Sequence, residues 1–260
     1  MIGIFDSGIG GLSVYKEILS RLPGVSTVYL GDQAYAPYGT KTKLEIGKRG
    51  QIITNYLLSQ GAQTIVIACN TATVNATVND LRQSFPQTVF IGVEPPVKPL
   101  SLLTKTNRVA IYATPLTCQS ERLRDLISTY AKGKQVFITP TPEWVQLVEN
   151  ADLASANARQ ILRQYTDDHL KLGIDYAGLG CTHFSFLKQT LKEVTNGQIN
   201  FIDIGQSVAK RVESLLPKTS HTNSLQSTHR FFTTSPNTRS LSAALKNLLK
   251  ISTKVEWVNI

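Results

Sequence analysis

Short apolar runs alternate with amphipathic stretches along the whole chain, and this alternation constrains the fold more than any other feature of the sequence. The apolar run IGIF, for example, is followed by a stretch in which Leu12, Tyr15 and Ile18 recur at helical spacing. An apolar strand followed by an amphipathic helix, repeated many times, is typical of a parallel sheet covered by helices. We therefore predict an α/β fold.

The alternation falls into two successive sets. Strands are predicted at residues 2–5, 26–32, 64–69 and 88–94 in the first set, and at 108–114, 135–140, 176–181 and 200–205 in the second. Helices are predicted at residues 11–23, 42–62, 71–85, 120–131, 154–172 and 184–194. Residues 216–230 are rich in Ser, Thr and Asn and predict a surface loop. The tail from Arg230 predicts strand, helix and strand, which we expect to complete the first sheet.

Small polar or reactive residues follow several predicted strands. They are Asp6 and Ser7, Asp32, Cys69 with Asn70 and Thr71, Glu94, and Cys181 with Thr182 and His183. In parallel α/β sheets, ligands bind beyond the carboxyl ends of the strands, so these residues are expected to converge. The glycine-rich stretch DSGIGG could present N–H groups to an anion. It lacks both the GxxxxGK[ST] and the GxGxxG signatures, so a nucleotide site is not predicted.

The chain has three cysteines, and none forms a CxxC pair. This pattern argues against a disulfide framework and against a zinc site, and no metal site is predicted. Cys118 precedes a predicted helix and is interpreted as a small buried apolar residue. Cys69 and Cys181 lie at strand ends beside ligand-like neighbours, so we interpret them as reactive. A thiol with a pKa of ~8.5 becomes a useful base only when a helix N-terminus or a cation lowers that value.

Each of these two thiols has a polar residue that could assist it. His183 is two residues from Cys181 and could exchange a proton with the thiol, although a surface or capping histidine is the alternative. Asp6 could assist Cys69, or it could be the N-cap of the following helix. Two thiols with separate partners suit a reaction that removes a proton on one side of a substrate and returns one on the other. A racemase or an epimerase requires this layout.

Charge and hydropathy bear on partners and location. The net charge of +9 comes from basic residues that are scattered rather than clustered with interleaved aromatic residues, so nucleic-acid binding is not predicted. The longest apolar runs fall well short of the roughly 18 residues needed for a membrane span. The first residues, MIGIFDSG, do not have the pattern of a secretory signal. We expect a cytoplasmic protein.

A series of short motifs resembles a known family along nearly the whole chain. They are IGIFDSGIGGLSV, VYLGDQAYAPYGTKT, TIVIACNTAT, FIGVEPPVKP, VAIYATPLT, LVE at residues 147–149, GLGCTHF and FIDIGQSVA. In order and spacing they resemble the bacterial glutamate racemases of the cofactor-independent Asp/Glu racemase family.

This resemblance implies roles for individual residues. It implies that Cys69 and Cys181 are the two acid/base thiols, with Asp6 assisting the first, His183 assisting the second, and Glu149 close to the second pair. It also implies a set of residues that hold the substrate's ammonium and carboxylate groups: Asp6, Ser7, Pro37, Tyr38, Gly39, Asn70, Thr71, Thr114, Thr117, Thr182 and His183.

The resemblance also implies an architecture and a biological setting. The family fold is two facing parallel-sheet α/β domains with the active site in the cleft between them. Here the first domain would comprise residues 1–93 and 206–260, and the second residues 94–205. The implied reaction converts L-glutamate to D-glutamate for peptidoglycan synthesis, in a homodimer that needs neither pyridoxal phosphate nor a metal.

The sequence departs from the usual family pattern in several places. Gln33-Ala34-Tyr35 replaces a common Thr-Ala-Arg run, HFSF follows the second cysteine instead of His-Tyr-Pro-Leu, DIG at 203–205 replaces Asp-Ser-Gly, and the lead-in to Glu149 also differs. Two alternatives to glutamate racemisation stay open. One is an aspartate, hydantoin or other amino-acid racemase, against which PYGTK and CNTAT favour glutamate. The other is a catalytically silent anion-binding homologue, which would not require two thiols.

Overall fold

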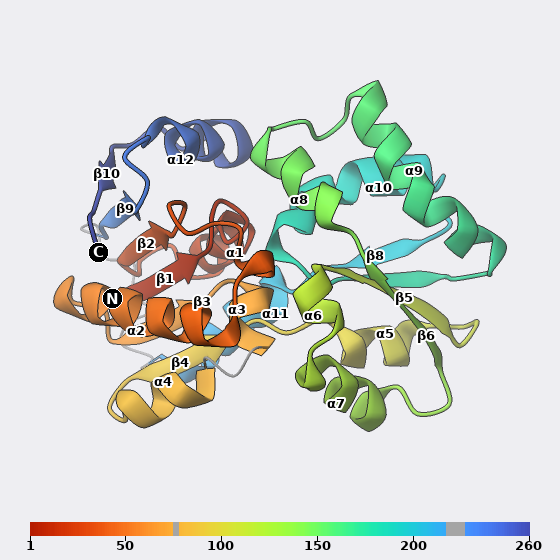
Figure 1. The fold of residues 1–260 in the computed structure, drawn as a ribbon, viewed down its shortest axis with the longest axis horizontal. Coiled ribbons are helices and arrows are strands. Elements are labelled where there is room, and N and C mark those ends of the chain that lie inside the picture. The colour runs from red at the N-terminus through yellow and green to blue at the C-terminus, as the bar shows by residue number, and fades with distance from the viewer. Residues whose placement is uncertain (75–77, 217–226) are drawn as a thin grey trace. The chain divides into compact units, whose positions relative to one another are not determined.

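The computed structural model describes residues 1–74, 78–216 and 227–260. The chain divides into two compact units, Met1–Val93 with Gly205–Ile260, and Glu94–Ile204. Each unit is built around its own parallel sheet with helices packed on it (Figure 1). The predicted α/β fold is confirmed.

Among the described residues, the first unit contains a six-stranded sheet in the order β10-β9-β2-β1-β3-β4. Its strands are β1 (Ile2–Asp6), β2 (Thr27–Gly31), β3 (Thr64–Ile67), β4 (Val89–Gly92), β9 (His229–Thr233) and β10 (Val255–Trp257). All neighbours are parallel, and Phe5 in the centre lies opposite both Leu30 and Ile67. Strand β9 pairs with β2, so the tail of the chain completes this sheet, as its pattern predicts.

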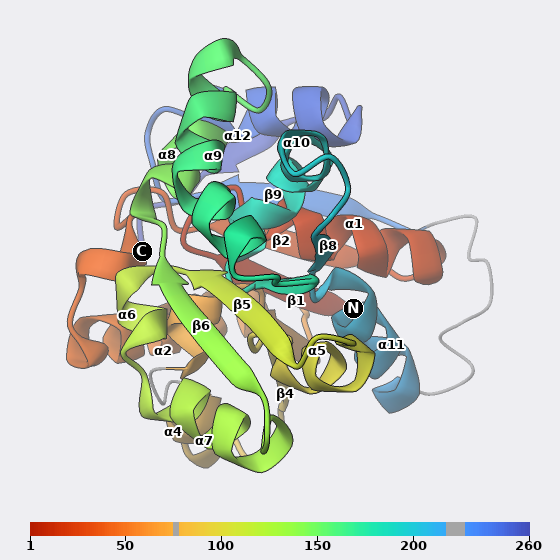
Figure 2. The same cartoon turned by 90° about the vertical axis from the view of Figure 1, so that its right-hand side faces the viewer.

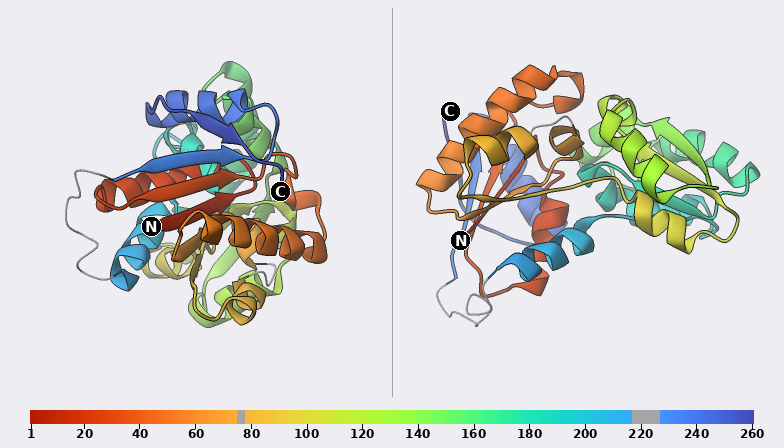
Figure 3. Two further views of the ribbon diagram at one scale, coloured as in Figure 1. Left: turned by 90° about the vertical axis from the view of Figure 1, so that its left-hand side faces the viewer. Right: turned by 90° about the horizontal axis from the view of Figure 1, so that it is seen from below.

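Helices cover both faces of the first sheet. They are α1 (Leu12–Arg21), α2 (Lys43–Ser59), α3 (Asn70–Ala72), α4 (Val78–Ser84), α11 (Gly205–Leu215) and α12 (Arg239–Ala244), which continues as a π-helix over Leu245–Leu249. Crossovers between parallel strands are right-handed, and the chain reverses its direction along the sheet after β2. Helices α1 and α11 therefore lie on the face opposite α2 and α4, as the view from below in Figure 3 shows.

The second unit has, within the described part of the chain, a four-stranded parallel sheet in the order β6-β5-β7-β8. Its strands are β5 (Arg108–Ala113), β6 (Gln135–Pro140), β7 (Tyr176–Leu179) and β8 (Asn200–Ile202). Its helices are α5 (Val97–Leu103), α6 (Pro115–Cys118), α7 (Glu121–Tyr130), α8 (Pro142–Glu149), α9 (Ala156–Lys171), a 3₁₀ helix (Thr182–Leu187) and α10 (Lys188–Val194). Helices α5 and α7 cover one face, and α8, α9 and α10 cover the other (Figure 2).

The predicted helices and loops are largely but not fully correct. The pattern did not predict α5, α6, α8 and α11, of which α6 and α8 begin at a proline. The predicted helix at 71–85 is split into α3 and α4, and residues 75–77 within it lie outside the described residues. Most of the predicted loop at 216–230 also lies outside them, at 217–226. His229, near its end, was predicted wrongly, because it pairs with Thr27 of β2 as the start of β9, whereas the strand predicted from Arg230 is confirmed.

Aromatic side chains pack against one another on one face of the second sheet. The ring centres of Tyr112 on β5 and Trp144 on α8 are 4.6 Å apart. The ring centres of Trp144 and Phe184, in the 3₁₀ helix, are 5.1 Å apart, and the two rings pack edge to face. All three side chains are fully buried. The Tyr112 hydroxyl also lies 2.5 Å from Nδ1 of His169 on α9. These contacts hold α8, α9 and the 3₁₀ helix on one face of the sheet. None of the helices within the described ranges combines the length and the hydropathy needed to cross a membrane.

We predict that Phe184→Ala lowers the free energy of unfolding of the second unit by about 3–5 kcal/mol, because it empties a fully buried ring site beside Trp144. The chain has two tryptophans, so a Trp257→Phe background leaves Trp144 as the fluorescent reporter during urea unfolding. Tyr130→Ala is the matched control, since this ring is 41% exposed, and it should change stability by less than about 0.5 kcal/mol. Equal losses in both variants would contradict the role of the stack.

Candidate active site

Each unit places a cysteine where its sheet changes winding direction. In the first unit, β1 and β3 are neighbours, but the helices that follow them lie on opposite faces of the sheet. In the second unit the same holds for β5 and β7. The loops after such strands separate and leave a crevice at the carboxyl edge, where α/β proteins bind ligands. Cys69 follows β3 and Cys181 follows β7, so each thiol lies at this switch point.

The first thiol site comprises Asp6, Ser7, Cys69, Asn70 and Thr71, all of which are buried. The Ala68 N–H donates to the Phe5 carbonyl at 2.7 Å and keeps the two strand ends in register. As a result, Cys69 Sγ lies 3.8 Å from Ser7 Oγ. Asn70 Nδ2 donates to the Val93 carbonyl at 3.5 Å, which ties the start of α3 to the end of β4. The structure therefore brings these five predicted residues to one edge of the sheet.

Asp6 is not a helix cap. The N-cap of α1 is Gly11, and Asp6 Oδ1 instead accepts a 2.7 Å hydrogen bond from the Gly8 N–H. The alternative role of Asp6 as an N-cap is therefore wrong. A Cβ atom on Gly11 would lie 2.6 Å from that of Asp6 and 3.0 Å from that of Ala68. The glycine at this position of DSGIGG thus makes room for the carboxylate beside the cysteine loop.

Pro37, Tyr38 and Gly39 form a turn beside this site. The Ala36–Pro37 peptide bond is cis, and Tyr38–Thr40 is a short 3₁₀ helix that packs against α3. The Tyr38 ring is buried, and its hydroxyl donates to Asp32 Oδ2 at 2.5 Å. Burial, followed by the neighbouring Asp32 carboxylate, raises the pKa of Tyr38 well above 10.0. The phenol therefore stays protonated and donates its hydrogen bond throughout the neutral range.

The second thiol site is a relay of three side chains. Cys181 Sγ lies 3.7 Å from Nδ1 of His183, and Nε2 of His183 lies 2.7 Å from Oε1 of Glu149. Cys181, Thr182 and His183 are buried, whereas the Glu149 side chain is 31% exposed. The second helical turn of α8 thus delivers a carboxylate to the histidine that follows β7. An imidazole held between a thiol and a carboxylate can take up and release protons at the sulfur.

The pKa of His183 reflects two opposing effects. Burial disfavours the charged imidazolium, but the hydrogen bonds and negative charges of Cys181 and Glu149 outweigh it and raise the pKa well above 6.5. In the protonated ring both nitrogens are donors, one toward the sulfur and one toward the carboxylate. His183 is therefore neither a surface residue nor an ordinary cap.

Thr114 and Thr117 lie at the end of β5, the strand next to β7. Thr114 is the N-cap of α6, and its hydroxyl accepts from the Thr117 N–H and donates to Oγ1 of Thr117 at 3.0 Å. The Gly180 N–H donates to the Tyr112 carbonyl at 2.7 Å. These two strand ends are therefore in register, and the structure brings Thr114 and Cys181 to the same edge of the second sheet.

Three other residues singled out in the sequence have partners of their own, and only Asp32 lies beside a thiol site, since its N–H donates to the Asp6 carbonyl at 2.8 Å. Cys118 is half-buried against the core around Leu123, and burial raises its pKa to about 11, which supports a structural role. Glu94 makes an exposed ion pair with Arg122 and belongs to the second unit. Asp32 binds Tyr38 and Arg49. Within the described ranges, no cluster of three or more His, Cys, Asp and Glu side chains could hold a metal ion.

The sequence model of the Asp/Glu/Hydantoin racemase family matches residues 2–212. The chain belongs to this family. Among curated members, the glutamate racemase of Pseudomonas paraeruginosa is 41% identical over 215 residues, which cover 83% of this chain and 81% of that protein. The glutamate racemase of Stutzerimonas stutzeri is 38% identical over 231 residues, which cover 89% and 87% of the two chains.

Solved structures of family members have the same fold. Glutamate racemase from Bacillus anthracis superposes with a TM-score of 0.89 at 28% identity, covering 100% of this chain and 97% of that one. Escherichia coli glutamate racemase, solved with L-glutamate and the activator UDP-MurNAc-ala, superposes with a TM-score of 0.84 at 29% identity, covering 99% and 97%. The fold of this racemase-family protein therefore agrees with its sequence matches over nearly its full length.

We predict that the ring signals of His183 titrate above pH 6.5 in an NMR titration, whereas those of His169 and His229, whose pKa values burial lowers, titrate below it. Glu149→Gln should lower the pKa of His183, because it removes a negative charge that lies 2.7 Å from Nε2. Because folding raises the pKa of His183, protonation of this ring stabilises the folded protein. This stabilisation is fully present below pH 6.5 and is lost as the pH rises through the pKa of His183 in the folded protein. An unchanged His183 titration in Glu149→Gln would contradict the relay.

Proposed function

We propose that this protein racemises glutamate without a cofactor, using Cys69 and Cys181 as alternating acid and base. The observation that carries the proposal is that each unit has one buried cysteine at its switch point, and each cysteine has its own polar partners. The family membership of the chain supports racemase chemistry. A family member that served only for binding would not require a thiol in both places.

In the proposed mechanism, one thiolate removes the proton from the α-carbon of one enantiomer, and the opposite thiol delivers a proton to that carbon from its other side. The roles exchange in the reverse direction. Asp6 assists Cys69, and His183 with Glu149 assists Cys181. The His183 relay moves a proton to or from Cys181, since its ring bridges sulfur and carboxylate at 3.7 and 2.7 Å.

The proposed substrate contacts come from the strand ends of each unit. The ammonium and carboxylate groups of glutamate are held by Ser7, the Pro37–Gly39 turn, Asn70, Thr71, Thr114, Thr117 and Thr182, together with Asp6 and His183. Hydroxyl, amide and backbone groups of this kind match a small zwitterion with a second carboxylate. The proposal of glutamate over aspartate is supported by the relatives, which are named glutamate racemases, and by related structures solved with L-glutamate and D-glutamate.

We also propose the biological setting that the family resemblance implies. The D-glutamate formed supplies peptidoglycan synthesis and so supports the cell wall and cell shape. The protein acts in the cytoplasm as a homodimer, without pyridoxal phosphate or a metal, and independently of membranes and nucleic acid.

Circular dichroism of L-glutamate solution incubated with the purified protein tests the function directly. The protein is first dialysed against chelator, and no cofactor is added. The optical signal should decay to zero as the racemic mixture forms, and it should do so from D-glutamate as well. A panel of aspartate, hydantoins and other amino acids is run in parallel. An unchanged glutamate signal would refute the proposal, and decay with another substrate alone would reassign the specificity.

We predict that Cys69→Ala and Cys181→Ala each lower racemisation in both directions to less than a few per cent of the parent rate. Each thiol is the base in one direction and the acid in the other, so losing either one stops both directions at steady state. Cys118→Ala is the matched control and should be nearly as active as the parent, because its thiol packs against the core. Turnover that survives in either of the first two variants would argue against a two-thiol mechanism.

We predict that Asp6→Asn slows the uptake of solvent deuterium more from D-glutamate, and that His183→Asn slows it more from L-glutamate. The family resemblance pairs Cys69 with D-glutamate and Cys181 with L-glutamate, and a well-placed acid or base contributes roughly 10²–10⁴-fold. The two enantiomers have equal energies, so kcat/KM changes equally in both directions, and exchange is the more selective measurement. Initial rates are followed by NMR. Equal slowing of both enantiomers by both variants would refute the assignment of one partner to each thiol.

A further inference from the structure

The stretch Gln33-Ala34-Tyr35, where this chain departs from its family, is bound to the returning tail of the chain. Gln33 Oε1 accepts from Thr233 Oγ1 at 2.9 Å, and Gln33 Nε2 donates to Ser240 Oγ at 2.9 Å. The Ala34 N–H donates to Thr234 Oγ1 at 3.0 Å. The end of β9 and the start of α12 thus hold the backbone that leads from Asp32 to the Tyr38 turn.

Tyr35 covers a buried cation. The guanidinium carbon of Arg49, on α2, lies 3.7 Å from the centre of the Tyr35 ring. The same guanidinium makes a bidentate pair with Asp32, at 3.0 Å from Nε to Oδ2 and 2.8 Å from Nη2 to Oδ1. Asp32 is fully buried and Arg49 is 6% exposed, whereas Tyr35 is 41% exposed. The ring of Tyr35 is therefore an outer cover over an ion pair that is shielded from water, where such contacts are strongest.

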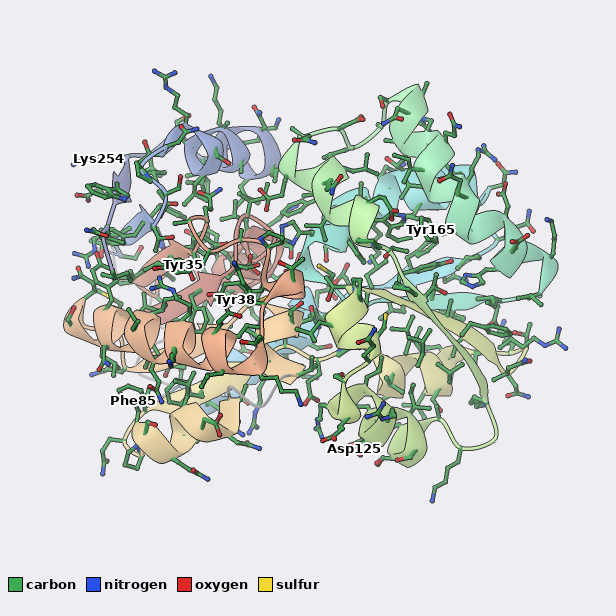
Figure 4. The ribbon with its side chains drawn as sticks, viewed as in Figure 1. Tyr35, Tyr38, Phe85, Asp125, Tyr165 and Lys254 are labelled. Atoms are coloured by element: carbon green, nitrogen blue, oxygen red, sulfur yellow. The ribbon has the colours of Figure 1, made fainter. Side chains whose placement is uncertain are left out.

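Asp32 connects this ion pair to the Tyr38 turn. Its Oδ2 accepts from the Tyr38 hydroxyl as well as from Arg49, and its Oδ1 accepts from Thr234 Oγ1 at 2.9 Å as well as from Arg49. Both carboxylate oxygens are thus shared between the charged partner and a hydroxyl. In Figure 4, Tyr35 and Tyr38 lie close together within the first unit. The Tyr38 hydroxyl is thus connected through Asp32, which follows β2, to Arg49 on α2 and to Thr234 in the tail.

We propose that Asp32, Arg49, Tyr35 and Thr234 are positioning residues that hold the Tyr38–Gly39 turn in the geometry required for substrate binding. In this inference, which rests on the proposed function, none of the four touches the substrate. They act through the Tyr38 hydroxyl and the backbone of the turn. The turn binds groups of the substrate that do not react. Loosening the turn therefore weakens the binding of the substrate and of the transition state equally. Such a change raises KM and leaves kcat nearly unchanged.

Mild variants test this inference better than removal of the ion pair. Loss of Arg49 would leave a buried carboxylate uncompensated and would mainly measure folding. Tyr35→Ala removes only the outer cover, and Thr234→Val removes one hydroxyl without changing the shape of the side chain. Thr54→Val is the matched control. Thr54 is fully buried on the same helix as Arg49, and its hydroxyl has no hydrogen-bond partner among residues 1–74, 78–216 and 227–260.

Thr234→Val should raise the KM for both enantiomers on the order of 10-fold, the effect expected for loss of a hydrogen bond to a charged group. Tyr35→Ala should raise the KM about 3-fold to 10-fold through loss of the cation–π contact. Tyr35→Phe should have the KM of the parent, because it keeps the ring. In all of these variants kcat should stay within about 2-fold of the parent. Thr54→Val should leave both constants unchanged.

A second measurement does not depend on turnover. The protein is labelled with 3-fluorotyrosine, and the ¹⁹F signal of Tyr38 is assigned by its loss in Tyr38→Phe. The signal should move in Thr234→Val and in Tyr35→Ala, and it should keep its position in Thr54→Val. If the parent does not racemise glutamate, the proposed function fails, and this signal alone decides whether Tyr35 and Thr234 position Tyr38.

Two results would overturn the inference. One is an unmoved Tyr38 signal together with parental KM values in Thr234→Val and Tyr35→Ala. The other is a loss of activity in these variants that appears only in kcat, follows the folded fraction and is reproduced by Thr54→Val. In that case the residues would be structural only.

Discussion

The pairing of β1 with β3, and of β5 with β7, is the constraint on which both thiol sites depend. Each pair is parallel, and the chain leaves the two strands of a pair toward opposite faces of the sheet. One backbone hydrogen bond of 2.7 Å closes each pair at its carboxyl end, from Ala68 to Phe5 and from Gly180 to Tyr112. A cysteine follows each of these bonds. The backbone therefore delivers each thiol to the switch point of its sheet, where α/β proteins bind ligands.

The two sites share this backbone plan but differ in the groups around the sulfur. Cys69 has a hydroxyl neighbour and a fully buried carboxylate on the adjacent strand end, and Gly11 leaves the space that Asp6 occupies. At the second site, Ala113 on β5 takes the position that Asp6 has on β1, so the neighbouring strand supplies no carboxylate. The ionisable partners of Cys181 are instead His183 and, through it, Glu149 on α8. The stretches TIVIACNTAT and YAGLGCTHFS therefore occupy equivalent positions in the two sheets.

Packing away from the strand ends supports each site by a different kind of interaction. In the second unit, apolar contacts among Tyr112, Trp144 and Phe184 hold the elements that carry Glu149 and His183. In the first unit, the buried Asp32–Arg49 ion pair lies beside the Tyr38 turn and binds the Tyr38 hydroxyl through Asp32. A buried ion pair adds little net stability compared with an apolar core, but its fixed geometry specifies one arrangement of its partners.

The amino-acid sequence by itself determined the α/β class and the strand and helix periodicity, because these patterns arise from neighbours along the chain. It also determined that Cys69 and Cys181 lie at the carboxyl ends of strands, although β3 and β7 each end two residues before the cysteine. It did not predict the short helix α8, or the partners of Asp32, which lie 17 residues away at Arg49 and 202 residues away at Thr234. Only the tertiary structure decided these contacts, because they depend on the order of strands in the sheet. That order places β9 beside β2, and the pattern of the tail predicts a strand of the first sheet but not which strand lies next to it.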